Sequence, residues 1–117
     1  MPIRNIERNR EYQRSWYANN RRRAQVSIYA SRKRRKQELK DFIAEYLSLR
    51  ACVDCGEKDI RVLDFDHVRD KKRDNISHLV RASVPSMKTL QIEISKCEIR
   101  CCNCHRKVTH ERRLVAR

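Results

Sequence analysis

The strongest hydrophobic pattern in the chain is helical and begins near residue 37. Five apolar side chains recur there at the spacing i, i+3, i+4, i+7 and i+8: Leu39, Phe42, Ile43, Tyr46 and Leu47. This spacing places them on one face of an amphipathic helix. Residues 4–36 have almost no apolar periodicity but contain no glycine or proline, so a helix is permitted there. We therefore predict a basic helical arm over residues 1–36 and a folded domain over residues 37–117, with no helix breaker between them.

A second pattern, an alternation with a period of two, predicts a strand over residues 61–68. Leu63 and Phe65 share one face of this strand. The run of charges that follows, residues 69–75, is typical of an exposed loop.

The rest of the chain predicts short elements. Apolar positions favour a short helix from Ile76, and Ser86 is placed to cap a second one. An extended piece over residues 98–100 leads to a final helix from His105, because no glycine or proline follows. Together with the strand, these elements predict an α+β fold class, a small module preceded by a long basic helical arm.

Composition and charge narrow the function. Of the 117 residues, 39% are hydrophobic and 38% charged, and no apolar run approaches the roughly 20 residues of a membrane-spanning helix. The first ten residues contain no apolar core of a secretory signal, so we expect a cytoplasmic protein that does not enter the membrane. The formal charge is +14, with 14 Lys and Arg against 5 Asp and Glu in residues 1–50. A nucleic-acid partner follows from this excess and from the predominance of arginine.

The candidate nucleic-acid-binding side chains are cations of the arm and of the final helix. They are Arg21, Arg22, Arg23, Arg32, Lys33, Arg34, Arg35, Arg106 and Lys107. A charge run is also compatible with a solvated surface, so the last two are as consistent with solvated helix charges as with a phosphate contact.

The six cysteines are clustered in a way that predicts a structural zinc site. Cys52-x-x-Cys55 and Cys101-x-x-Cys104 are two chelating pairs, and four thiolates at tetrahedral geometry suit Zn²⁺. Cysteines of a reducing compartment more often bind metal than form disulfides. Gly56, the single glycine, follows the first pair where a tight turn often needs a positive φ. The two remaining cysteines, Cys97 and Cys102, are interpreted as small buried residues.

Three further residues have a chemistry that zinc does not require. Asp66 and His67 are adjacent at the end of the predicted strand, and His105 directly follows the last zinc cysteine. The zinc site ties the two segments together, so we expect Asp66 and His105 to approach each other. A carboxylate and an imidazole would form an open, partly aqueous site for a hard cation such as Mg²⁺ or Mn²⁺. His67 is then left to take a proton from water.

Taken together, the two Cys-x-x-Cys pairs, the segment Leu63-Asp64-Phe65-Asp66-His67 and the segment 101–106 resemble the HNH (ββα-metal) endonuclease family. The resemblance covers residues 50–113 and is greatest to the small zinc-bound branch found in phages and bacteria. It implies that Asp66 and His105 hold the catalytic Mg²⁺ or Mn²⁺ and that His67 is the general base. It also implies DNA as the substrate, cleaved to 5′-phosphate and 3′-hydroxyl ends.

One position departs from the family pattern. Lys96 stands about nine residues before His105, where the family often has an asparagine. Asn75 and Asn103 are the possible substitutes. The asparagine of the family bears on the orientation of the loop that carries the base, so its replacement by Lys96 bears on that orientation too.

Two other functions are compatible with the composition. The first is a non-catalytic zinc-stabilised module that binds nucleic acid, and the second is an RNA-binding protein such as a ribosomal one. Both explain the charge, but neither explains the set Asp66, His67 and His105. The oligomeric state, monomer or dimer, is left open.

Overall fold

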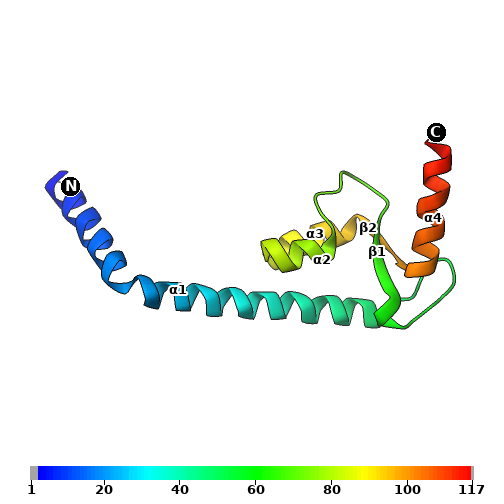
Figure 1. Ribbon diagram of the computed structural model, residues 1–117, viewed down its shortest axis with the longest axis horizontal. Helices are drawn as coiled ribbons and strands as arrows, with labels where there is room; N and C mark the ends of the chain where they lie inside the picture. The colour runs from blue at the N-terminus through cyan, green and yellow to red at the C-terminus, as the bar shows by residue number, and fades with distance from the viewer. Residues whose placement is uncertain (1–2, 117) are drawn as a thin grey trace. The chain divides into compact units, whose positions relative to one another are not determined.

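The computed structural model describes residues 3–116, and its contacts divide the chain into two compact units, Met1–Arg34 and Arg35–Arg117. The long helix α1 (Ile3–Ser48) contributes to both units (Figure 1). It runs unbroken through residues 36 and 37, so the predicted absence of a breaker at that point is confirmed. Within the first unit Asn20 leaves helical geometry, with φ −119° and ψ 15°, and its side chain donates to the carbonyl of Trp16 at 2.8 Å.

The second unit contains all the remaining elements. In chain order they are a 3₁₀ turn (Ile60–Val62), β1 (Leu63–His67), α2 (Ile76–His78), a π-helical turn (Leu79–Ser83), α3 (Met87–Ser95), β2 (Cys97–Cys101) and α4 (Cys102–Val115). The fold is therefore α+β, as predicted. None of the helices in the described part of the chain is long and apolar enough to cross a membrane.

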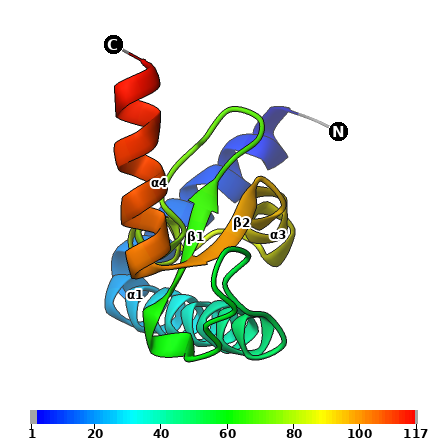
Figure 2. The same ribbon diagram turned by 90° about the vertical axis from the view of Figure 1, so that its right-hand side faces the viewer.

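The sheet consists of β1 and β2, paired antiparallel with Leu63 opposite Cys101 and His67 opposite Cys97. Because side chains alternate along a strand, one face of the sheet carries the buried side chains of Leu63, Cys97, Ile99 and Cys101. The other face carries the charged side chains of Asp64, Asp66, Glu98 and Arg100. In Figure 2, α4 lies on one side of the two strands and α3 on the other.

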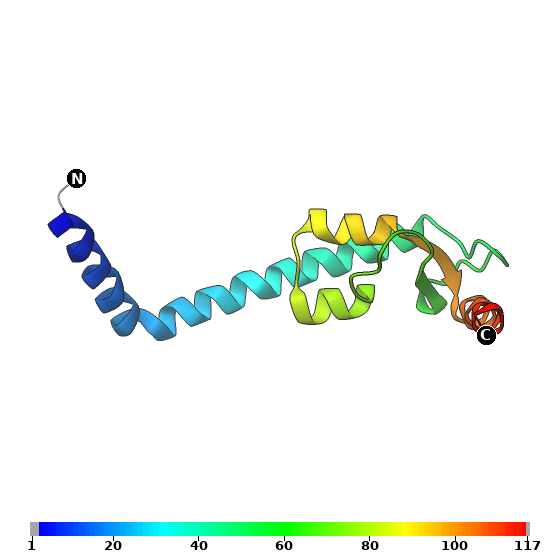
Figure 3. The same cartoon turned by 90° about the horizontal axis from the view of Figure 1, so that it is seen from above.

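The apolar face predicted for residues 39–47 is confirmed, and it joins α1 to the core of the second unit. Leu39 is 1% exposed and packs with Leu79 and Leu90, while Leu47 packs with Leu63. Full burial of a leucine contributes about 2 kcal/mol relative to an exposed one. In the view of Figure 3, α2 and α3 flank this last part of α1.

The helix cap predicted at Ser86 and the tight turn predicted at Gly56 are also confirmed. The Ser86 hydroxyl accepts a hydrogen bond from the amide of Thr89 at 3.3 Å and begins α3. Gly56 has φ 79°, in the left-handed region that favours glycine. The last helix begins at Cys102, three residues earlier than predicted, and is capped by Cys101.

Candidate metal and nucleic-acid site

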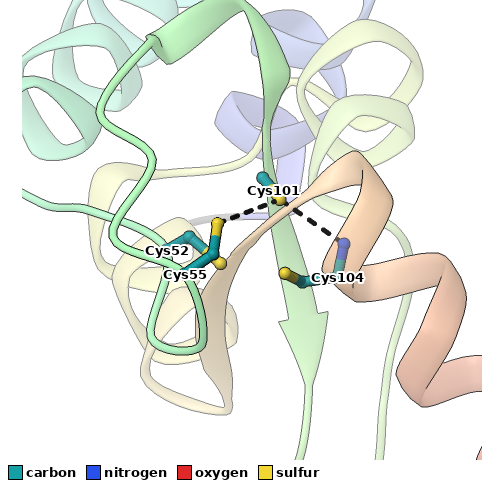
Figure 4. Close-up of side chains that lie close together, drawn as sticks. All are labelled: Cys52, Cys55, Cys101 and Cys104. Atoms are coloured by element: carbon teal, nitrogen blue, oxygen red, sulfur yellow. Dashed lines mark hydrogen bonds between the residues drawn. The ribbon is translucent and has the colours of Figure 1, made fainter.

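Four cysteines converge on one point between the loop after α1 and the junction of β2 with α4 (Figure 4). The sulfur atoms of Cys52, Cys55, Cys101 and Cys104 all lie within 4.8 Å of one another. Cys55 Sγ lies 3.6 Å from Cys101 Sγ. Zn–S bonds of about 2.3 Å at tetrahedral angles place two sulfurs about 3.8 Å apart, so the set fits Zn²⁺. Cys101 belongs to this four-cysteine group, as its spacing predicted.

The backbone of the first pair forms the tight turn that brings its sulfurs together. The amide of Cys52 donates to the carbonyl of Glu57, and the amide of Gly56 donates to the carbonyl of Cys52, both at 2.9 Å. Burial raises the pKa of the Cys52 thiol, but hydrogen bonds from the backbone of Cys101, Cys55 and Asp54 outweigh it and lower the pKa to about 6. A thiol of this kind is already disposed to bind metal as a thiolate.

The other two cysteines differ from each other. Cys97 is 7% exposed, as predicted, and burial raises the pKa of its thiol to about 11. The prediction for Cys102 is wrong, because its side chain is exposed. Cys102 is the first residue of α4, and its neighbour Cys101 already occupies the buried position at the end of the strand.

Asp66 lies on the charged face of the sheet, beneath α4. It is 2% exposed, and its carboxylate accepts from Nη1 of Arg112 at 2.8 Å and from the guanidinium of Arg100. Burial raises the pKa of Asp66, but the hydrogen bonds from Arg112 and Arg100 outweigh it, so the pKa lies below its ordinary value. The expected open, partly aqueous site is therefore enclosed on the side of Asp66, because α4 covers this carboxylate and supplies a cation to it, whereas the His105 side chain is 31% exposed.

His105, on the first turn of α4, lies between two carboxylates. Its Nε2 is 3.5 Å from Oδ1 of Asp66, and its Nδ1 is 3.3 Å from Oδ2 of Asp64. The expected approach of Asp66 and His105 is therefore observed. Asp64 was not among the predicted site residues, although its position two residues before Asp66 places it on the same strand face.

His67 points to the opposite face of the sheet, as strand alternation requires. Its Nε2 lies 3.0 Å from Oε1 of Glu93, a residue of α3 that is 1% exposed. The same carboxylate accepts from Nζ of Lys96 at 2.8 Å and from the amide of Arg73 at 2.9 Å. Burial raises the pKa of Glu93, but these three hydrogen bonds lower it to about 2.

Glu93 was missed because it lies between Leu90 and Ile94 on the buried side of α3, where a pattern of apolar positions gives no sign of a charge. The only sequence signal was Lys96, three residues later, at the spacing of a helical ion pair. Asn75 precedes α2 and Asn103 is exposed on α4, and neither contacts His67 among the hydrogen bonds of the described residues.

A cleft of about 740 Å³ opens beside this site. Its lining includes Asp64 and His105 together with three cations, Lys36, Lys40 and Arg81. The walls between them are apolar and come from α1, β1 and the segment around α2. A negatively charged ligand that enters the cleft would reach the side chain of His105.

The predicted nucleic-acid-binding cations are all exposed. In the first unit they are Arg21, Arg22, Arg23, Arg32, Lys33 and Arg34, and in the second Arg35, Arg106 and Lys107. A comparison with known proteins finds no matching family model, no similar curated protein and no similar solved structure.

Proposed function

We propose that this protein is a divalent-metal-dependent endonuclease that hydrolyses phosphodiester bonds in DNA, built on a zinc-stabilised ββα-metal module of the HNH type. The observation that carries the proposal is the 3.5 Å approach of His105 Nε2 to Asp66 Oδ1. Two ligands bonded to one Mg²⁺ at about 2.1 Å and at right angles lie about 3 Å apart. The pair therefore fits the ligand set that the sequence resemblance implies.

In this proposal Asp66 and His105 hold Mg²⁺ or Mn²⁺. When bound, the ion supplies electrostatic stabilisation to the charge that develops on the phosphate and on the leaving oxygen. His67 takes a proton from the attacking water, whose oxygen forms a bond to phosphorus. The bond from phosphorus to the 3′ oxygen breaks, and that oxygen takes a proton from solvent. The products are a 5′-phosphate and a 3′-hydroxyl.

The charge distribution supports a polyanionic substrate. The three cations of the cleft lie beside Asp64 and His105, where a phosphodiester backbone would be drawn toward the site. The cations of the arm would add affinity that does not depend on sequence and that weakens with salt. A setting in a phage or another mobile element belongs to the same proposal and rests on the family resemblance.

A second candidate is a non-catalytic zinc-stabilised module that binds nucleic acid. Two observations favour it. The guanidinium groups of Arg100 and Arg112 already neutralise the Asp66 carboxylate, and His67 lies on the opposite face of the sheet, against Glu93. In that case Asp66 would serve to fasten α4 to the sheet.

A supercoiled-plasmid assay separates the two candidates. Zinc-loaded protein is incubated with plasmid and Mg²⁺ or Mn²⁺, and the wild type is compared with His67→Ala. His78→Ala is a matched control, because His78 is an exposed histidine that pairs with Asp74 outside the site. We expect nicking by the wild type and the control, and a loss of about 10²-fold or more in His67→Ala. A wild type that never nicks with either metal, while it still binds DNA, would establish the second candidate instead.

A further inference from the structure

His67, the proposed base, is hydrogen-bonded to the buried carboxylate of Glu93, a residue outside the motifs that resemble the nuclease family. Glu93 has both oxygens occupied: Oε1 by His67 Nε2 and by the amide of Arg73, and Oε2 by Lys96 Nζ. A carboxylate that is 1% exposed must have all its hydrogen bonds satisfied to remain ionised in the core, and this one does. Glu93 is therefore a fixed anion beside the imidazole.

The contact determines which nitrogen of His67 carries the proton. An ionised carboxylate can only accept hydrogen bonds, so Nε2 must be the donor. Among the described residues every buried side-chain nitrogen or oxygen has a hydrogen-bond partner. Nε2 of His67 is taken by Glu93 and the side chain is 10% exposed, so Nδ1 is the ring nitrogen left to accept a proton.

We propose that Glu93 is a positioning residue that holds His67 as the Nε2–H tautomer and so presents Nδ1 as the nitrogen that takes the proton from water. The inference rests on the proposed nuclease function. After the transfer both nitrogens carry protons, and the Nε2–H group remains on Glu93, whose negative charge stabilises the imidazolium. A carboxylate behind an imidazole performs this orientation in many hydrolytic sites.

Lys96 belongs to the same arrangement, and this accounts for a lysine where the resemblance leads one to expect an asparagine. Its ammonium group donates to Glu93 and to the carbonyl of Lys71 at 2.8 Å. Its own carbonyl accepts from the amides of Val68 and Arg69, the two residues that follow the base. Lys96 thus binds the Glu93 carboxylate through its side chain and the backbone that follows His67 through its carbonyl.

The test compares Glu93→Ala and Glu93→Gln with the wild type, as zinc-loaded full-length protein. Asp74→Asn is the matched control, because Asp74 also pairs with a histidine, His78, but outside the site. Two readouts are taken: kcat and KM for plasmid nicking, and the tautomer of His67 from long-range ¹H–¹⁵N spectra at a pH where the ring is neutral. Glutamine keeps an oxygen that can occupy the place of Oε1, and alanine keeps none.

We expect the Nε2–H tautomer in the wild type, in the control and in Glu93→Gln, and a mixture of tautomers in Glu93→Ala. We expect kcat of Glu93→Ala to fall by at least about tenfold with KM changed by less than about twofold, and Glu93→Gln to recover part of the loss. A role in folding alone would instead lower zinc content and DNA affinity and would not be relieved by glutamine, which would overturn the inference.

Two further results have distinct meanings. A wild type that nicks DNA but holds His67 as the Nδ1–H tautomer would overturn the role of Glu93 and leave the nuclease function intact. A wild type that never nicks would overturn the nuclease proposal, and the positioning role with it, whatever tautomer His67 adopts.

Discussion

Arg112 donates a hydrogen bond from Nη1 to Oδ1 of Asp66 at 2.8 Å. His105, two turns earlier on α4, approaches the same oxygen with its Nε2, at 3.5 Å. The positive charge of Arg112 therefore lies beside the position that a divalent cation bound by Asp66 and His105 would occupy. Because two cations compete for one carboxylate, binding of the ion requires the guanidinium to give way, at least in part.

Replacement of Arg112 should consequently strengthen metal binding. We expect Arg112→Gln to lower the Kd for Mn²⁺ of the zinc-loaded protein by about two- to tenfold, since a partly exposed ion pair of this kind is worth about 1 kcal/mol. Electron paramagnetic resonance measures the free Mn²⁺ in a titration. Arg113→Gln removes the neighbouring charge from α4 without touching Asp66, and its Kd should stay near that of the wild type. An equal change in both variants would mean that only the overall charge matters.

The four-cysteine group should bind one Zn²⁺ and stabilise the second unit. We expect Cys101→Ser to lose the metal and to melt at a lower temperature, because the small core of the unit leaves much of its stability to the metal. Elemental analysis gives the zinc content, and circular dichroism follows unfolding. Cys102→Ser is the matched control: its side chain is exposed at the adjacent position, and it should keep a full complement of zinc. Loss of zinc in the control but not in Cys101→Ser would show that the ligand assignment is wrong.

The buried Glu93 predicts a particular dependence of stability on acid. Its pKa in the folded protein is about 2, below the ordinary value of 4.5. The charged form of Glu93 is thus favoured by folding. Its contribution to the free energy of unfolding is present above pH 4.5 and is lost as the pH falls from about 4.5 to 2. The shift corresponds to a contribution on the order of 3 kcal/mol.

Glu93→Gln should flatten the fall of the unfolding free energy over this pH range, as measured by denaturant titrations at several pH values with excess zinc. Asp59→Asn is the control, because the pKa of Asp59 is also lowered to about 2, but by an exposed pair with Arg61. Exposed pairs contribute little to stability, so this variant should follow the wild type. If both variants flatten the curve equally, the burial of Glu93 is not the cause.

The arm should contribute to DNA affinity through its charge alone. We expect the triple replacement of Arg21, Arg22 and Arg23 by glutamine to reduce the slope of log K against log salt by roughly 2 to 3, because each neutralised phosphate releases counterions. Fluorescence anisotropy with duplex DNA at several salt concentrations measures the slope. Lys58→Gln, an exposed cation outside the arm, serves as the control and should leave it unchanged. An unaltered slope in the triple variant would remove the arm from the interface.

Local chemistry along the chain was sufficient to predict much of this protein. The apolar face of residues 39–47, the turn at Gly56, the cap at Ser86 and the place of Cys101 rather than Cys102 in the cysteine cluster all depend on neighbours within a few residues. Such features are set by helical or strand periodicity, by allowed φ values and by the bite of a Cys-x-x-Cys pair, which the sequence displays directly.

The tertiary structure alone decided what surrounds the proposed catalytic residues. Arg100 reaches Asp66 only because β1 and β2 pair in one particular register, and Arg112 only because α4 crosses the charged face of the sheet. Glu93 is a polar residue on a short helix until α3 packs and encloses it with His67 and Lys96. Periodicity separates buried from exposed positions but cannot assign most partners of buried charges. Apart from Lys96, three residues from Glu93, those partners lie 20 to 46 residues away in the chain. The sequence by itself therefore determined the elements and the two Cys-x-x-Cys pairs of the four-cysteine cluster. The packing of α3 and α4 determined that Asp66 is enclosed by arginines and that His67 is held by Glu93.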